Sequence, residues 1–187
     1  MSVIAQAGAK GRQLHKFGGS SLADAKCYLR VAGIMTDYAQ AGDMMVVSAA
    51  GSTTNQLISW LQLSQTDRLS AHQVQQALRR YQMDLIASLL PADAADALIA
   101  TFIHDLERLA GLLDSGITDA VYAEVVGHGE VWSARLMAAV LNHLGVEAAW
   151  LDARAFLRAE RAAQPQVDEG LSYPLLQQLL VQHPGKR

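Results

Sequence analysis

Short apolar runs alternate with long amphipathic segments along this chain, and that alternation constrains its fold more than any other feature. Met44–Val47 is a continuous apolar run bounded by Asp43 and Ser48, a pattern typical of a parallel strand covered on both faces. Two further runs, at 13–17 and 146–151, also predict strands. The sequence therefore predicts an α/β fold with a mostly parallel sheet sandwiched by helices.

Segments of helical periodicity fill most of the remaining sequence. The first helix is expected to begin at the capping pattern Ser21-x-x-Asp24 and to end near residue 41. Further helices are expected around 57–61 and over 71–90, 94–113, 118–144 and 171–182. Gly127 and Gly129 interrupt one of them, which indicates either a break or a place where another group approaches the backbone.

Composition excludes several classes of protein. With 187 residues, 51% of them hydrophobic and 18% charged, the chain can bury a core and is neither disordered nor a coiled coil. The net charge of −3 comes with no basic stripe for nucleic acid. Cys27 is the only cysteine, which favours a reducing cytoplasm, and no apolar run approaches the roughly 20 residues that span a bilayer. We expect a flexible tail over 1–12 and one unit over 13–187.

The two turns that follow the first two predicted strands carry the groups of an anion site. Residues 16–21 read K-F-G-G-S-S, and the hydroxyl-rich residues 48–55 follow the second strand. Ligands of open α/β sheets bind at the carboxyl ends of strands, where glycine backbone, a helix N-terminus and Lys16 would favour phosphate. The sequence matches neither GxxxxGK[ST] nor GxGxxG. An ordinary Gly-Gly turn beside a lysine remains the alternative.

Glu130 is a further candidate because it follows Gly127-His128-Gly129, where small residues leave space. Its carboxylate could hold an ammonium group, although spacing alone favours a glutamate that faces solvent. We interpret His128 as structural. The six histidines show no HExxH-like spacing, so no metal site built by the protein is expected.

Four motifs resemble those of aspartokinases, members of the amino-acid kinase fold family. Residues 16–24 resemble the opening signature, and 47–55 resemble its V-S-A-x-x-x-x-T-N turn. The His-Gly-Glu at 128–130 and the Asp-Ala-Arg at 152–154 follow in the same order. The N-terminal extension also resembles that of bifunctional aspartokinase/homoserine dehydrogenases of the methionine-pathway type.

The resemblance implies the carbamate kinase-like fold of this family, with its N-terminal lobe only. The family's G-R-G-G-S-D and W-T-D-V segments are absent from the sequence. Residues 13–187 are therefore expected to be the N-terminal portion of a catalytic domain, truncated before the nucleotide-binding half and inactive by itself. NADP would serve a dehydrogenase half that this chain does not contain.

The activity implied by the resemblance is transfer of phosphate from ATP to L-aspartate, the first step towards lysine, threonine and methionine. Lys16 would be the catalytic residue, neutralising charge on the phosphoryl group. The groups expected at phosphate are Lys16, Gly18, Gly19, Ser20 and Ser48. The groups expected at aspartate are Ser48, Thr54 and Glu130. Mg²⁺ would bridge the ATP phosphates, with ligands partly outside this chain.

Other functions remain open. The chain could belong to a kinase that phosphorylates glutamate, acetylglutamate or a nucleotide, although the turn at 48–55 and the His-Gly-Glu at 128–130 favour aspartate. It could also be a non-catalytic fragment that binds an anion or associates with a partner. A homo-oligomer is expected, with no nucleic-acid or membrane partner.

Overall fold

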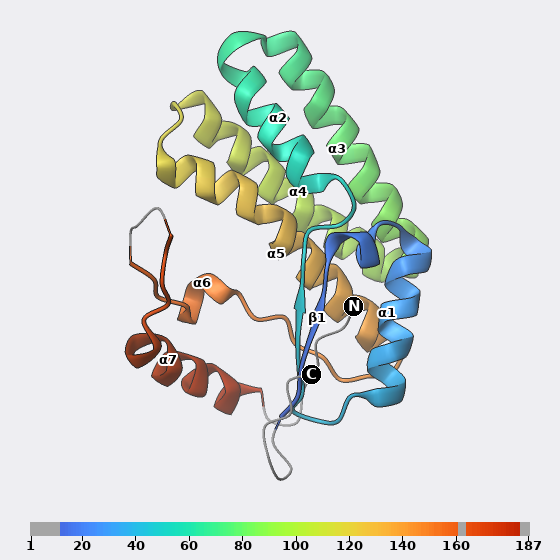
Figure 1. Cartoon of the computed structure of the whole chain (residues 1–187). Helices are drawn as coiled ribbons and strands as arrows, with labels where there is room; N and C mark the ends of the chain where they lie inside the picture. Colours follow the sequence, from blue (N-terminus) through green and yellow to red (C-terminus); the bar gives the residue numbers. More distant parts are fainter. Residues whose placement is uncertain (1–11, 161–163, 184–187) are drawn as a thin grey trace.

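Two parallel strands run through the middle of the molecule, with helices around them (Figure 1). The computed structural model describes residues 12–160 and 164–183. Strand β1 (Leu14–Phe17) pairs in parallel with β2 (Met44–Val47), so that their carboxyl ends are adjacent. The predicted parallel α/β arrangement is confirmed. The tail expected over 1–12 lies outside the described residues, apart from Arg12.

The chain from β1 enters a short 3₁₀ helix, η1 (Gly19–Leu22), before helix α1 (Ala25–Tyr38). The expected helix start at Ser21 is wrong, because Asp24 is the N-cap of α1. Its carboxylate accepts a hydrogen bond of 2.8 Å from the backbone N–H of Cys27. The segment between β1 and α1 instead forms the glycine turn and η1.

Four long helices form the largest part of the structure and pack against one another (Figure 1). They are α2 (Thr53–Thr66), α3 (Arg68–Leu89), α4 (Ala92–Asp114) and α5 (Asp119–His143). One leucine from each of α2, α3 and α4 is fully buried in their common core, namely Leu57, Leu78 and Leu109. Each such leucine contributes about 1.5–3 kcal/mol by leaving water.

Helix α5 runs behind the strands and contacts both β2 and α1 (Figure 1). It is one continuous helix, so the break considered at Gly127 and Gly129 is not present. The other interpretation of these glycines holds for Gly129, whose backbone is approached closely by the turn after β2.

The strand expected at 146–151 is wrong, since this segment forms no strand in the described structure. The side-chain amide of Asn142 donates to the carbonyl of Ala148 at 2.8 Å and accepts from its N–H at 3.2 Å. Both backbone groups of Ala148 are thereby occupied by a side chain instead of a neighbouring strand. The buried side chains of Val146 and Ala148 still anchor the segment to the core.

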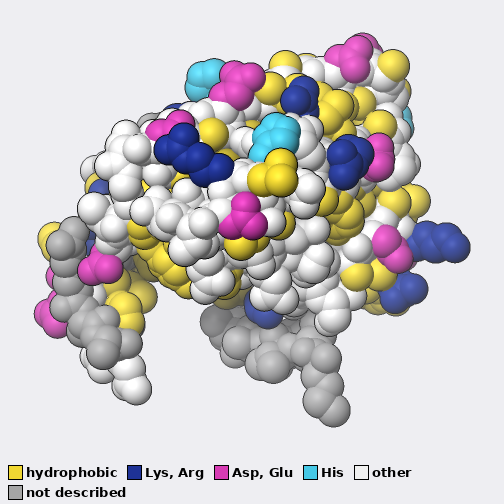
Figure 2. Space-filling model, turned by 90° about the horizontal axis from the view of Figure 1, so that it is seen from above, with side chains coloured by type: hydrophobic (Ala, Val, Ile, Leu, Met, Phe, Trp, Pro, Cys, Tyr) yellow, Lys and Arg dark blue, Asp and Glu magenta, His cyan; other side chains and the backbone are white. Residues whose placement is uncertain are grey.

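The chain ends its described path in two helices that pack together, α6 (Ala153–Phe156) and α7 (Glu169–Gln182). In Figure 1 they lie to one side of the α2–α5 helices, and Arg154 of α6 forms an ion pair of 3.0 Å with Glu124 of α5. Figure 2 shows charged side chains of both signs interspersed with hydrophobic ones on the face that it displays. Of the helices formed by residues 12–160 and 164–183, none combines the length and hydropathy needed to cross a membrane.

Candidate functional site

The turns after β1 and β2 lie against each other. The backbone N–H of Ser48 donates to the carbonyl of Phe17 at 3.1 Å, which joins the two turns where they leave the sheet. A Cβ atom at Gly19 would lie only 3.1 Å from the carbonyl oxygen of Ala49. Glycine at this position therefore allows the two backbones to approach closely, and a larger residue would push them apart.

Lys16 lies in β1, and its side chain folds back over the glycine turn. Its Nζ is 3.3 Å from the point that a Cβ atom of Gly18 would occupy. The backbone N–H of Ser21 donates to the carbonyl of Gly18 at 2.9 Å, which closes the turn. Ser20 is exposed within it. An ammonium group, glycine backbone and a hydroxyl are thus presented at one edge of the sheet.

Helix α5 brings Glu130 to the turn after β2. The backbone N–H of Ala49 donates to Oε1 of Glu130 at 3.2 Å. A Cβ atom on the preceding Gly129 would lie 2.7 Å from Cβ of Ala49 and 3.3 Å from Cγ2 of Thr53, so the helix can approach only through glycine. Within the described residues, Oε2 of Glu130 has no hydrogen-bond partner. One carboxylate oxygen is therefore held in place while the other is available to a cation.

The first turn of α2 completes the constellation. Ser52 is its N-cap, yet within the described part of the chain its side chain makes no capping hydrogen bond. Thr53 is fully buried, and Thr54 follows it in a half-buried position. Uncapped N–H groups at the start of a helix favour an anion, both through their hydrogen bonds and through the helix dipole.

A cavity of about 600 Å³ extends from Glu130 between β2, α5 and the segment 148–154. A volume of this size is typical of a small-molecule site. Glu124, Asp152 and Arg154 lie at its wall. Of the predicted site residues, only Glu130 lines this cavity. The cavity therefore adjoins the candidate site at Glu130.

An ion-pair network lies next to this cavity. Glu124 binds Arg108 at 2.8 Å and Arg154 at 3.0 Å, and Arg154 also donates to Asp152 at 2.6 Å. The hydrogen bonds from Arg154 hold the pKa of Asp152 below its usual range. The network joins α4, α5 and the start of α6.

His128 is buried inside this network. Arg108 donates to its Nε2 at 2.8 Å, and since a guanidinium cannot accept, Nε2 is the unprotonated nitrogen. Nδ1–H then donates to the carbonyl of Glu124 at 2.6 Å. Burial lowers the pKa of His128, although the nearby carbonyl and carboxylate of Glu124 oppose the shift. Both ring nitrogens are engaged, as a structural histidine requires.

The structure brings the predicted site residues to one edge of the sheet. Lys16 comes from β1, and Gly18, Gly19 and Ser20 come from the turn after it. Ser48 and Thr54 come from the turn after β2 and the helix that it starts, and Glu130 comes from α5. Their chemical roles stay predictions. Within residues 12–160 and 164–183, no group of three histidine, cysteine, aspartate or glutamate side chains could hold a metal ion.

Sequence reasoning missed the contribution of α3. Gln82 donates through Nε2 to the hydroxyl of Thr53 at 2.8 Å, and Tyr81 donates to the carbonyl of Ala23 at 3.1 Å. One signal was present in the sequence. Gln82 lies four residues from both Leu78 and Ile86, so it is a polar residue on the apolar face of a helix.

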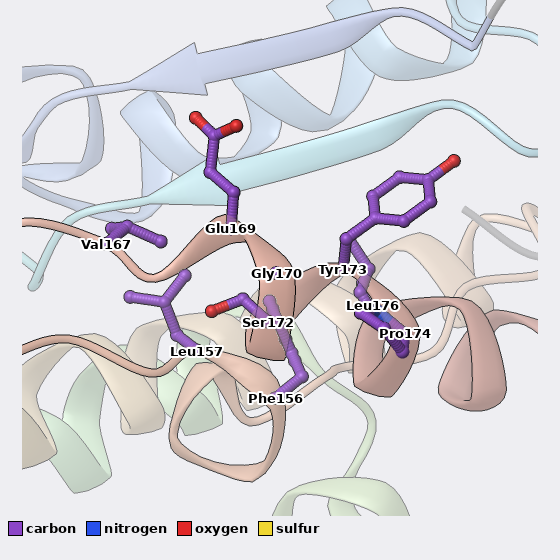
Figure 3. A pocket seen from close by; sticks show the side chains of 9 residues that line it. All are labelled: Phe156, Leu157, Val167, Glu169, Gly170, Ser172, Tyr173, Pro174 and Leu176. Carbon is purple, nitrogen blue, oxygen red and sulfur yellow. The ribbon is translucent and has the colours of Figure 1, made fainter.

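A second cleft, of about 500 Å³, lies between α6 and α7. Apolar side chains such as Phe156, Leu157 and Val167 line it. Figure 3 shows the carboxylate of Glu169 and the hydroxyl of Tyr173 extending away from Phe156 and Leu157. None of the residues predicted to bind substrate lines this cleft.

Comparison with known proteins assigns the family. The model of the amino acid kinase family matches residues 11–186, so the chain belongs to the amino acid kinase family. It is 86% identical over 187 residues to "Bifunctional aspartokinase/homoserine dehydrogenase 2" of Escherichia coli K12, covering all of this chain and 23% of that protein. It is 27% identical over 161 residues to a chloroplastic bifunctional aspartokinase/homoserine dehydrogenase 1 of Arabidopsis thaliana, covering 83% of this chain and 18% of that protein.

The same relationship is found among solved structures. Aspartokinase III of E. coli in complex with aspartate and ADP superposes with a TM-score of 0.78 and 25% identity, covering 89% of this chain and 37% of that one. The resemblance to aspartokinases is thereby confirmed. The chain spans less than a quarter of the length of the E. coli bifunctional relative.

Proposed function

We propose that this chain supplies the aspartate-binding and phosphoryl-binding turns of an aspartate kinase within a bifunctional aspartokinase/homoserine dehydrogenase. The observation that carries the proposal is the meeting of three segments at one sheet edge. Lys16 lies over the glycine turn, that turn lies against Ala49, and Ala49 donates to Glu130. The names of the similar proteins support the same activity.

The proposed reaction needs no strong general base, because the side-chain carboxylate of aspartate is already a nucleophile. One of its oxygens forms a bond to the γ-phosphorus of ATP while the bond from that phosphorus to the leaving ADP oxygen breaks. Catalysis then depends on positioning and on neutralising charge. The Lys16 ammonium would neutralise the phosphoryl oxygens. Backbone N–H groups at Gly18, Gly19 and Ser20 would donate to them.

Aspartate would be held on the other side of the phosphoryl group. The available Oε2 of Glu130 would accept from the substrate ammonium, since Oε1 is held by Ala49. The hydroxyls of Ser48 and Thr54 would donate to the reacting end of the substrate. A bound carboxylate there also gains from the uncapped first turn of α2.

Mg²⁺ would supply further charge neutralisation at the ATP phosphates. The described residues offer no carboxylate cluster that could hold this ion, so we assign it no residue of this chain. NADP is likewise assigned to no residue here. We further propose that the protein acts in the cytoplasm as a homo-oligomer, with L-aspartate and ATP as its small-molecule partners.

To test the proposal, the protein is expressed from the complete reading frame and incubated with ATP and one of three acceptors, L-aspartate, L-glutamate or N-acetylglutamate. Hydroxylamine traps an acyl phosphate as a hydroxamate, which is measured by its colour with iron. Product is expected with aspartate. A preference for glutamate or acetylglutamate would instead establish a different amino-acid kinase. No product with any acceptor, from folded protein, would favour the non-catalytic alternative.

A further inference from the structure

Helix α3 reaches both turns of the candidate site through two consecutive residues, although it contributes no group to the site itself. Tyr81 donates its hydroxyl to the carbonyl of Ala23, just after η1. Gln82 donates its side-chain amide to Thr53, the first residue of α2. Residues adjacent in a helix point in directions about 100° apart. Consecutive residues of one turn of α3 can therefore contact two different segments, the one after η1 and the start of α2.

The contact of Gln82 is deeply buried. Its side chain is 3% exposed, Thr53 is fully buried, and Nε2 lies 2.8 Å from the hydroxyl oxygen. A buried amide without a partner is destabilising, so this pair holds its geometry strongly. The methyl group of Thr53 packs on the other side against Gly129 of α5. Thr53 is thus clamped between α3 and α5, immediately before Thr54.

Tyr81 acts on the adjoining backbone. Its hydroxyl lies 2.7 Å from the point that a Cβ atom of Gly51 would occupy, and Gly51 has a positive φ of 50°. The same hydroxyl donates to Ala23. Tyr81 therefore fixes the distance between the segment after β1 and the turn after β2.

We propose that Gln82 is a positioning residue of the kinase site, which holds the first turn of α2 so that Thr54 and the uncapped N–H groups face the aspartate substrate. The inference rests on the proposed function. Gln82 itself touches no substrate. Gln82 positions the first turn of α2 through the hydroxyl of Thr53. The neighbouring contact of Tyr81 holds the segment after β1 and the turn after β2 at a fixed separation.

The decisive variant is Gln82→Met, which keeps the volume and length of the side chain but removes its donors. In protein expressed from the complete reading frame, we expect the KM for aspartate to rise about three- to tenfold, with a smaller change in kcat and in the KM for ATP. The matched control is Ile86→Val on the same face of α3, which removes one buried methyl group. It should lower thermal stability slightly and leave the KM for aspartate unchanged.

A double variant separates positioning from stability. Gln82→Met with Thr53→Val removes both polar groups, so no hydroxyl is left buried without a partner. The midpoint of thermal unfolding should then recover relative to Gln82→Met, while the KM for aspartate stays raised. A KM that recovers together with stability would show a merely structural role and overturn the inference.

Failure of the inference and failure of the proposed function are distinguishable. If the unaltered protein phosphorylates aspartate but Gln82→Met matches the Ile86→Val control, only the inference is wrong. If the unaltered protein phosphorylates no aspartate, the proposed function is wrong and the inference falls with it. Amide hydrogen exchange at residues 52–55 is a second readout. It should be faster in Gln82→Met than in the control, and equal rates would contradict the positioning role.

Discussion

At the residue scale, the two carboxylate oxygens of Glu130 have different surroundings. Oε1 accepts from the N–H of Ala49, whereas Oε2 has no hydrogen-bond partner among the described residues. Glu130 also lines the cavity beside β2. The side chain is exposed overall, as sequence spacing favoured. The hydrogen bond that Glu130 accepts from a turn 81 positions earlier in the chain is a finding of the structure, whereas the family resemblance implied only that Glu130 binds aspartate.

Replacing Glu130 with glutamine tests the role of its charge. The amide oxygen can still accept from Ala49, but the negative charge offered to the substrate ammonium is lost. We expect the KM for aspartate to rise about ten- to hundredfold, in line with the loss of a charge-assisted hydrogen bond. Steady-state kinetics at varied aspartate measures it. An unchanged KM for aspartate would remove Glu130 from the substrate site.

Lys16 is expected to act on the transition state more than on substrate binding. In Lys16→Ala, kcat should fall about 10²- to 10³-fold, because charge developing on the phosphoryl group is no longer neutralised. The KM for aspartate should change far less. Lys26→Ala, an exposed lysine on α1, is the control and should keep normal kcat. A large rise in KM with normal kcat for Lys16→Ala would contradict this role.

At the element scale, the close approach of α5 to the turn after β2 decides where Glu130 lies. The two glycines of α5 differ in this respect. A Cβ at Gly129 would clash with Ala49 and Thr53, while a Cβ at Gly127 would have no atom outside its own helix within 4 Å. Close packing of α5 on the turn therefore requires glycine at 129 but not at 127.

Alanine substitution at these two positions should have opposite effects. Gly127→Ala should stabilise the fold by up to about 1 kcal/mol through helix propensity. Gly129→Ala should destabilise it by about 1–3 kcal/mol, because α5 and the turn must separate. Urea unfolding of both variants measures the difference. Equal effects of the two substitutions would mean that α5 does not pack on the turn as described.

Local patterns predicted the elements well and their ends less well. The helices over 71–90 and 94–113 and the strand at 44–47 follow from periodicity and apolar runs, which are local properties. The strand expected at 146–151 did not form, because hydrogen bonds from Asn142 occupy the backbone of Ala148. A side chain that competes for backbone groups cannot be recognised from hydropathy.

At the scale of the whole molecule, the network around Glu124 and His128 connects α4 through Arg108 to α6 through Arg154. His128 accepts from Arg108 and donates to the carbonyl of Glu124, so its ring is satisfied only when neutral. If Nε2 were protonated, its N–H and the N–H of Arg108 would be two donors facing each other, and the hydrogen bond between them would be lost. Folding stability is therefore linked to the protonation of this ring.

The linkage has a definite sign. Burial lowers the pKa of His128 in the folded state, so below about pH 6.5 the unfolded chain binds a proton that the folded chain excludes. Stability from this group is present above pH 6.5 and decreases as the pH falls, by at most about 1.4 kcal/mol per pH unit. Denaturant unfolding between pH 7.5 and 5.5 measures the slope.

Two histidine variants identify the source of that slope. His128→Asn should have a smaller loss of stability over this pH range, whereas the exposed His104→Asn on α4 should behave like the unaltered protein. The pKa of the Asp152 carboxyl is lowered by Arg154, so this group changes folding stability only below about pH 4 and does not contribute to the slope measured here. An identical slope in His128→Asn and His104→Asn would contradict the assignment.

The activity of residues 1–187 by themselves is a separate prediction. The chain spans 37% of the solved aspartokinase III with which it superposes, and the sequence lacks the family's later nucleotide-binding motifs. We expect little or no aspartate-dependent ADP formation from these residues alone, compared with the protein expressed from the complete reading frame. A coupled ADP assay on both proteins measures this. Comparable turnover in the two would overturn the expectation.

The sequence alone was sufficient for the alternation of strands and helices, for the glycine turn with its lysine and for the order of the family motifs, because each depends on residues close together in the chain. Only the tertiary structure decided that Gly129 packs on Ala49, that Glu130 has one oxygen held and one available, and that Gln82 clamps Thr53. These contacts join residues 29 to 81 positions apart. Their energies depend on burial and on close approach in space, which no local period or propensity contains.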